Sequence, residues 1–312
     1  MSKRVIFDTD IGTDVDDCLA LALILASPEL RLEAVTCVYG DVRLRARIAQ
    51  KLLSLAGRDE VPIYFGAERP LLGLQPVYWA GHEGVGILAD DDPPLRVQSQ
   101  PAAAYLVEAA RANPGQLHLL AVGPLTNLAL ALRMEPELPT LLASLTIMGG
   151  AVRGHNQLHL AFAEHNLRCD PEAAHVVFSS QASPTLVPLD VTTLVQIDRA
   201  GEQRIRAGGT AWHQAVAEQV ALYPRFAQSG KTYLHDPLAA ALLVDPSLVE
   251  VTPLHLVVEL QGCLAGAILA HTPDAQHPAN AMVALKVDRA RFEPWFVERI
   301  ATCVMPGGLR AG

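Results

Sequence analysis

The pattern that most constrains the fold of this chain is a regular alternation of short apolar segments with longer segments of helical character. Helical segments at 16–26, 44–56 and 126–133 lie between strand-length apolar segments. The six apolar segments are 4–7, 32–39, 62–65, 117–122, 145–148 and 185–189. Such alternation is typical of βαβ units, in which helices cover both faces of a parallel sheet. We therefore predict an α/β fold with an open, mostly parallel, Rossmann-like sheet.

The last third of the sequence is less regular and predicts additional helices. We expect one long helix over 211–229, a shorter helix at 237–244 and a final helix at 289–302, with strands at 251–260 and 281–287. No internal repeat and no linker rich in Pro, Gly or Ser divides the 312 residues. We therefore expect a single domain, residues 1–312.

Charge and composition exclude several classes of protein. The chain has 33 acidic and 24 basic residues, only four of them lysine, so we expect no cationic surface for a nucleic-acid polymer. No segment approaches the roughly 20 uninterrupted apolar residues of a membrane span, and the first residues lead into a strand instead of a signal peptide. We expect a cytoplasmic protein without a membrane partner. The five widely spaced cysteines predict buried thiols and neither a disulfide framework nor a zinc site.

The densest chemical signal is the segment DTDIGTDVDD at 8–17, which has five carboxylates in ten residues before a predicted helix. Capping the helix and complementing its dipole would need only one or two aspartates. Crowded carboxylates need a counter-cation, and hard oxygen ligands suit Ca²⁺ or Mg²⁺. The spacing differs from that of an EF-hand loop. The segment is therefore a candidate site for a divalent cation.

Three further segments place polar residues where helices begin. His235 and Asp236 can set a proton donor beside a metal ligand, although such a pair also caps helices. In VGPLTN at 122–127, backbone carbonyls can face a cation, with helix capping as the alternative. Glu164 and Asn166 offer hydrogen-bonding groups suited to sugar hydroxyls, whereas DPE at 170–172 is typical of a helix start.

Taken together and in this order, these segments resemble the inosine-uridine nucleoside hydrolase family. The similarity extends from Asp8 to the strand at 280–287 and includes GPLTN, MGG at 148–150, AEHN at 163–166, LDVT at 189–192 and HDP at 235–237. It implies the family's α/β fold and calcium-dependent hydrolysis of the N-glycosidic bond of ribonucleosides to free base and ribose. It also implies a homo-oligomer, either a dimer or a tetramer.

The resemblance also implies a role for individual residues. Ca²⁺ is expected to bind Asp10, Asp17, Asp236 and the backbone carbonyl of Thr126. Asp10 is in addition expected to take the proton of the attacking water, and His235 to protonate the leaving base. The expected substrate-binding residues are Asp16, Asp41, Met148, Glu164, Asn166, His82, Tyr223 and Tyr233. Oxygen atoms around the ribose would stabilise the positive charge that develops on the sugar.

The chain departs from the family's opening pattern, Asp-x-Asp-Pro-Gly-x-Asp-Asp. Ile11 replaces the proline, and two extra residues precede the pair at 16–17, so that Asp14 competes for the metal role. Asp41 replaces an asparagine and can only accept hydrogen bonds. The glycine-rich loop at 81–86 is shorter than the family's, so the correspondence of His82 to the family's pocket histidine stays open. The preferred base stays open.

Two alternatives are weighed against this interpretation. The first is a calcium-dependent nucleoside-binding protein without turnover, suggested by Asp41 and the two-residue insertion, but the retained Asp10 and His235 argue against it. The second is a phosphatase of the haloacid dehalogenase type, which also begins with Asp-x-Asp after its first strand. That family needs a threonine or valine where Gly12 stands.

Overall fold

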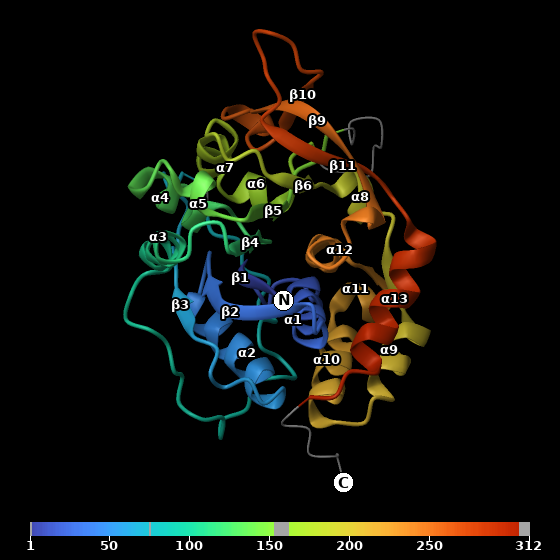
Figure 1. Ribbon diagram of the computed structural model, residues 1–312. Helices are drawn as coiled ribbons and strands as arrows, with labels where there is room; N and C mark the ends of the chain where they lie inside the picture. The colour runs from blue at the N-terminus through green and yellow to red at the C-terminus, as the bar shows by residue number, and fades with distance from the viewer. Residues whose placement is uncertain (1, 75, 153–161, 306–312) are drawn as a thin grey trace.

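The computed structural model describes residues 2–74, 76–152 and 162–305, and its centre is a nine-stranded sheet (Figure 1). The strand order is β10-β9-β11-β6-β5-β4-β1-β2-β3. The strands are β1 (Lys3–Thr9), β2 (Leu30–Cys37), β3 (Ile63–Phe65), β4 (Leu117–Ala121), β5 (Ser144–Met148), β6 (Thr185–Val187), β9 (Val249–Val258), β10 (Ile268–His271) and β11 (Ala281–Val287). Pairing is parallel from β3 to β11, and β9 is antiparallel to both of its neighbours. The predicted open, mostly parallel sheet is confirmed.

Helices cover both faces of this sheet and form two separate cores. In β1, Val5 and Phe7 point to one core and Ile6 to the other, as alternate residues of a strand do. The first core is covered by α1 (Asp16–Ala26), α2 (Val42–Leu55), α8 (Leu189–Thr192), α9 (Arg199–Arg206), α10 (Ala211–Leu222), α11 (Pro224–Ser229), α12 (His235–Leu242) and α13 (Arg289–Ala301). The second is covered by α3 (Ala102–Ala112), α4 (Thr126–Met134), α5 (Leu138–Leu141), α6 (His165–Cys169) and α7 (Pro171–Phe178).

The strand order places a crevice at the carboxyl ends of β1 and β4. The chain runs from β1 outward through β2 to β3 and then returns to the other side of β1 with β4. Where the order reverses in this way, the loops leave the sheet in opposite directions and open a binding crevice. The segment after β1 begins with Asp10, and the segment after β4 begins with Val122. The acidic turn therefore lies at the switch point of the sheet.

The predicted long helix over 211–229 is wrong, because the structure has two helices there, α10 and α11. They are separated at Tyr223, whose backbone is extended (φ −60°, ψ 126°). A residue that precedes proline is disfavoured in the helical region, and Pro224 follows directly. The break turns the Tyr223 side chain into the cavity described below.

Some short elements and one cysteine were not anticipated. The three-residue strands β7 (Gln196–Asp198) and β8 (Lys231–Tyr233) form a separate antiparallel pair. The expectation of buried thiols is wrong for Cys263, which is exposed in a 3-10 turn (Gly262–Leu264), and Cys303 is only half-buried. Across the described residues, no helix combines the length and the apolar character that a membrane crossing requires.

Candidate active site

The acidic turn between β1 and α1 is shaped by its backbone and not by helix capping. Gly12 has φ +118°, and a Cβ atom there would lie 2.7 Å from the Ile48 Cδ1 atom. Helix α1 begins after Val15, and no side chain caps it. Among the described residues, Asp14 accepts hydrogen bonds from the adjacent amide of Val15 and from the hydroxyl of Tyr223. The capping alternative therefore does not account for these aspartates.

Arg45, which the sequence analysis did not single out, holds this turn from helix α2. Its side chain is fully buried. The guanidinium donates to the carbonyl of Tyr39 (2.6 Å), to the carbonyls of Asp10 and Ile11 (3.0 Å to Ile11), and to the Thr13 hydroxyl (3.1 Å). It also lies 3.9 Å from the Asp10 carboxylate. Arg45 thus fixes the backbone of the turn and offsets part of its negative charge.

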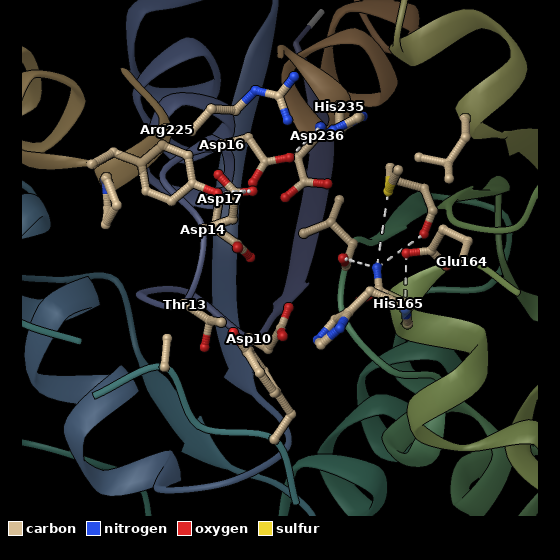
Figure 2. A pocket seen from close by; sticks show the side chains of 18 of the residues that line it. Asp10, Thr13, Asp14, Asp16, Asp17, Glu164, His165, Arg225, His235 and Asp236 are labelled. Carbon is tan, nitrogen blue, oxygen red and sulfur yellow. Dashed lines mark hydrogen bonds between the residues drawn. The ribbon is translucent and has the colours of Figure 1, made fainter. Parts of the chain in front are cut away.

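Three carboxylates meet in the crevice. Asp16 and Asp17 come from the start of α1 and Asp236 from the start of α12, which packs against α1. Each offers an oxygen atom, and these oxygens lie within 4.8 Å of one another. Figure 2 shows the three side chains gathered together, with Asp14 and Asp10 along the same wall. The Asp236 amide donates to Asp16 (3.3 Å), and the Thr9 hydroxyl donates to Asp17.

The electrostatics of this group call for a cation. Burial raises the pKa of Asp16, Asp17 and Asp236 well above the usual range of aspartate, and repulsion between the neighbouring carboxylates raises it further. Among the described residues, no arginine, lysine or histidine forms an ion pair with any of the three. A buried set of hard oxygen donors fits a divalent cation such as Ca²⁺ or Mg²⁺.

Asp8 has a different task from the other aspartates of the turn. It is fully buried and accepts hydrogen bonds from the Thr36 hydroxyl (2.5 Å) and the Asn127 amide (2.8 Å). Burial raises the pKa of Asp8 to about 7. Asp8 therefore links β1 to β2 through Thr36 and to α4 through Asn127, whose side-chain oxygen in turn accepts from the Ala67 amide (2.8 Å) after β3.

Thr126, the expected metal ligand, does not line the cavity. It is the first residue of α4, where a backbone carbonyl accepts a hydrogen bond from the next turn of the helix. Its hydroxyl donates to Asp170 (2.7 Å). The residue of this segment that lines the cavity is Val122. A Cβ atom on the next residue, Gly123, would lie 3.0 Å from the Asp10 carboxylate, so the Val122–Gly123 peptide is beside Asp10.

The wall opposite the acidic turn is formed by the segment that follows β5. Glu164 caps α6 by accepting from the Asn166 amide (2.8 Å) and also accepts from the Gly150 amide (2.9 Å). The Asn166 side-chain amide donates to the Val122 carbonyl (2.6 Å). Met148 and His165 line the same wall, which Figure 2 shows across the cavity from Asp10. The expected sugar-side residues are therefore brought together.

His235 and Tyr223 come from the C-terminal third. The His235 Nδ1 atom lies 2.7 Å from the Thr192 hydroxyl, and burial lowers the pKa of His235 to about 4. The Tyr223 hydroxyl donates to Asp14 (2.7 Å), and burial raises the pKa of Tyr223. The His82 ring lies near Tyr223, and its Nε2 atom is 3.0 Å from the Thr13 carbonyl.

The cavity has a volume of about 860 Å³. Two of the expected substrate-binding residues, Asp41 and Tyr233, do not line it. Asp41 is exposed and caps α2 by accepting from the Leu44 amide (2.9 Å). The Tyr233 ring is covered by the guanidinium of Arg225, 4.0 Å from the ring centre, and it is Arg225 that lines the cavity. Sequence reasoning missed Arg45 and Arg225, and it assigned no individual role to Val122 and Thr192, which lie in segments that it singled out.

Comparisons with known proteins agree with this architecture. The family model described as inosine-uridine preferring nucleoside hydrolase matches residues 5–294. The chain is 33% identical to the pyrimidine-specific ribonucleoside hydrolase RihA of Citrobacter koseri, with 96% of this chain and 99% of that protein covered. It is 31% identical to the inosine-uridine preferring nucleoside hydrolase of Crithidia fasciculata, over 94% and 95% of the two chains.

Solved structures lead to the same family. The chain superposes on the purine-preferring ribonucleoside hydrolase from Gardnerella vaginalis with a TM-score of 0.85 and 28% identity, covering 96% of this chain and 98% of that one. A plant nucleoside hydrolase gives a TM-score of 0.83 with 29% identity, covering 96% and 99%. On this evidence the chain is a member of the inosine-uridine preferring nucleoside hydrolase family.

Proposed function

We propose that this chain hydrolyses the N-glycosidic bond of ribonucleosides in the crevice between β1, β4 and α12, with Ca²⁺ as its cofactor. The observation that carries the proposal is the buried group of Asp16, Asp17 and Asp236 at the switch point of the sheet. A binding protein without turnover would not need a half-buried histidine beside these carboxylates. Family membership supports the reaction class.

For the metal, we assign the carboxylates of Asp10, Asp17 and Asp236 and the backbone carbonyl of Val122. Val122 takes the place first given to Thr126 because it lines the cavity beside Asp10, whereas Thr126 lies inside α4. When bound, Ca²⁺ supplies positive charge that orients a water molecule and lowers its pKa. Asp14 is assigned instead to the Tyr223 hydroxyl, which donates to its carboxylate (2.7 Å).

Asp10 accepts the proton of the attacking water in this proposal. Its carboxylate lines the cavity, and Arg45 fixes the backbone of residues 10 and 11. Arg45 also lies close enough to favour the ionised form of Asp10, against the effect of burial. A carboxylate held in place in this way can act as a general base without moving.

The ribose lies between the acidic turn and the wall opposite. Asp16 is assigned to the 2′-hydroxyl, and Glu164, Asn166 and Met148 to the rest of the sugar, since all four line the cavity. As the bond to the base breaks, positive charge develops on the ring. Fixed carboxylate and amide oxygens stabilise this charge without reorganisation.

His235 assists the departing base by donating a hydrogen bond from its neutral ring, and it transfers a proton from its doubly protonated form. The Thr192 hydroxyl lies 2.7 Å from Nδ1, and if the hydroxyl donates, the neutral ring carries its proton on Nε2. Tyr223 and His82 line the cavity and are assigned to the base. Relatives include a pyrimidine-specific and a purine-preferring enzyme, so family membership does not select the base.

Release of reducing sugar from inosine, adenosine, guanosine, uridine and cytidine tests the proposed function. We expect ribose from at least one nucleoside and none from Asp10→Ala, with binding of the nucleoside retained in that variant. Tight binding without ribose release by the wild-type protein would favour the binding-protein alternative. Release of phosphate from small phosphoesters would instead favour the phosphatase.

We further propose that the chain is one domain that assembles as a homo-oligomer, a dimer or a tetramer, and acts in the cytoplasm. This assembly is proposed from the resemblance to the family. Light scattering on the purified protein would decide it, and a mass equal to that of one chain, 33.5 kDa, would contradict it.

A further inference from the structure

Three histidines gather at the edge of the sheet, on an element that the proposed reaction does not use. His255 is on β9 and His271 is on β10, and the two residues are directly opposite each other in the antiparallel pair. His277 belongs to the loop between β10 and β11, which projects beyond the sheet at the top of Figure 1. Directly opposed residues point to the same side of a sheet.

His255 and His277 have the ring spacing of imidazoles around one metal ion, and the two pairs that include His271 are wider. The ring centres are 5.2 Å apart for His255 and His277, 6.0 Å for His271 and His277, and 6.3 Å for His255 and His271. With a zinc–nitrogen bond of about 2.1 Å, the centres of two imidazoles on a shared ion lie about 5 to 6 Å apart, depending on the bond angle.

Hydrogen bonds fix the tautomers of two of these rings. The His255 Nδ1 atom lies 2.8 Å from the carbonyl oxygen of Pro278, which can only accept, so this nitrogen carries the proton. The His277 Nδ1 atom faces the Asp274 carboxylate at 3.2 Å, which also accepts. In both rings the lone pair is therefore on Nε2. Metal-binding histidines are typically oriented by partners of this kind.

The loop that carries His277 is itself held in a tight turn. The Asp274 carboxylate accepts from the amides of Gln276 (2.8 Å) and His277 (2.7 Å), and the Asp274 amide donates to the His277 carbonyl (3.1 Å). Of the three rings, only that of His271 forms no hydrogen bond with another described residue. Its side chain is exposed, and its ring contacts are with His255 and His277.

We propose that His255, His271 and His277 form a second metal site, selective for a borderline ion such as Zn²⁺. Imidazole nitrogen suits Zn²⁺, whereas the carboxylates of the crevice suit Ca²⁺. Among the described groups, only the crevice carboxylates already have all their ligand atoms within 4.8 Å of one another. Rotation of His271 closes the site, and water completes the coordination.

Zinc titration of the untagged full chain, with Ca²⁺ saturating the crevice, tests this site by equilibrium dialysis and metal analysis. We expect one Zn²⁺ per chain, an affinity about a hundredfold lower in His271→Ala and His277→Ala, and about tenfold lower in Asp274→Asn, which removes the orienting partner. His175→Ala is the matched control, because His175 is an exposed histidine in the wall of a groove that also contains His255.

The variants are compared for circular dichroism and ribose release, which we expect to match those of the wild type. Zinc binding that is equal in the wild type and in His271→Ala would overturn the proposal. Binding that falls equally in His175→Ala, or no zinc in the wild type, would overturn it as well. Because Ca²⁺ occupies the carboxylates and the readout is zinc content, failure here is distinct from failure of the proposed reaction.

Discussion

Replacing Arg45 by methionine tests how the acidic turn is held. Methionine keeps the unbranched, apolar part of the side chain but removes every donor, so the buried carbonyls of Tyr39, Asp10 and Ile11 lose their partner. Removing one member of a buried charged network costs about 3–5 kcal/mol. Unfolding entropy is about 2.1 cal/mol/K per residue, or about 0.65 kcal/mol/K for this chain. A loss of about 4 kcal/mol therefore predicts a Tm lower by about 6 °C.

Thermal unfolding followed by circular dichroism, with Ca²⁺ at saturation, measures this effect. Arg47→Met is the matched control, because Arg47 is on the same helix but only half-buried, and we expect a change within about 0.5 kcal/mol. Ribose release by Arg45→Met should fall together with its affinity for Ca²⁺. A Tm within about 1 °C of the wild type, which corresponds to a loss below about 0.7 kcal/mol, would refute the role given to Arg45.

Four further substitutions separate the roles assigned in the crevice. His235→Ala should lower kcat about a hundredfold for natural nucleosides and much less for a riboside with an activated leaving group. Thr192→Val should lower the same two kcat values by a smaller factor. Equal losses of kcat for the two substrates would contradict the assignment. Thr126→Val should cost about 1–2 kcal/mol of stability through its bond to Asp170 but leave Ca²⁺ affinity unchanged, as measured by titration. Tyr223→Phe removes a hydrogen bond to the Asp14 carboxylate, so kcat/KM should fall about tenfold; wild-type kinetics would show that this contact has no part in the reaction.

The central sheet could be predicted because its parallel strands are buried on both faces and are therefore continuous apolar segments. The strands β7 and β8 have three residues each, too few for a pattern to show. The break between α10 and α11 did have a signal, since Tyr223 precedes a proline. That signal was outweighed by the apolar residues on either side of it.

The candidate site was predictable in its carboxylates but not in its supporting contacts. Asp16 and Asp17 stood out because the sequence crowds carboxylates before a helix, and Asp236 stood out because it follows His235 at a predicted helix start. Arg43, Arg45 and Arg47 look alike in the sequence, and only tertiary packing shows that Arg45 reaches the turn. Similarly, spacing along residues 122–126 does not reveal which backbone carbonyl faces the cavity, because the chain passes there from strand to helix.

The measurement that tests the central claim most directly is ribose release by the wild-type protein and by Asp17→Asn, each after removal of metal by a chelator and again after addition of Ca²⁺. We predict that chelation abolishes ribose release by the wild type, that Ca²⁺ restores it, and that Asp17→Asn stays inactive at Ca²⁺ concentrations that saturate the wild type. Undiminished release in the chelated protein, or full activity of Asp17→Asn, would contradict a metal-dependent reaction at these carboxylates.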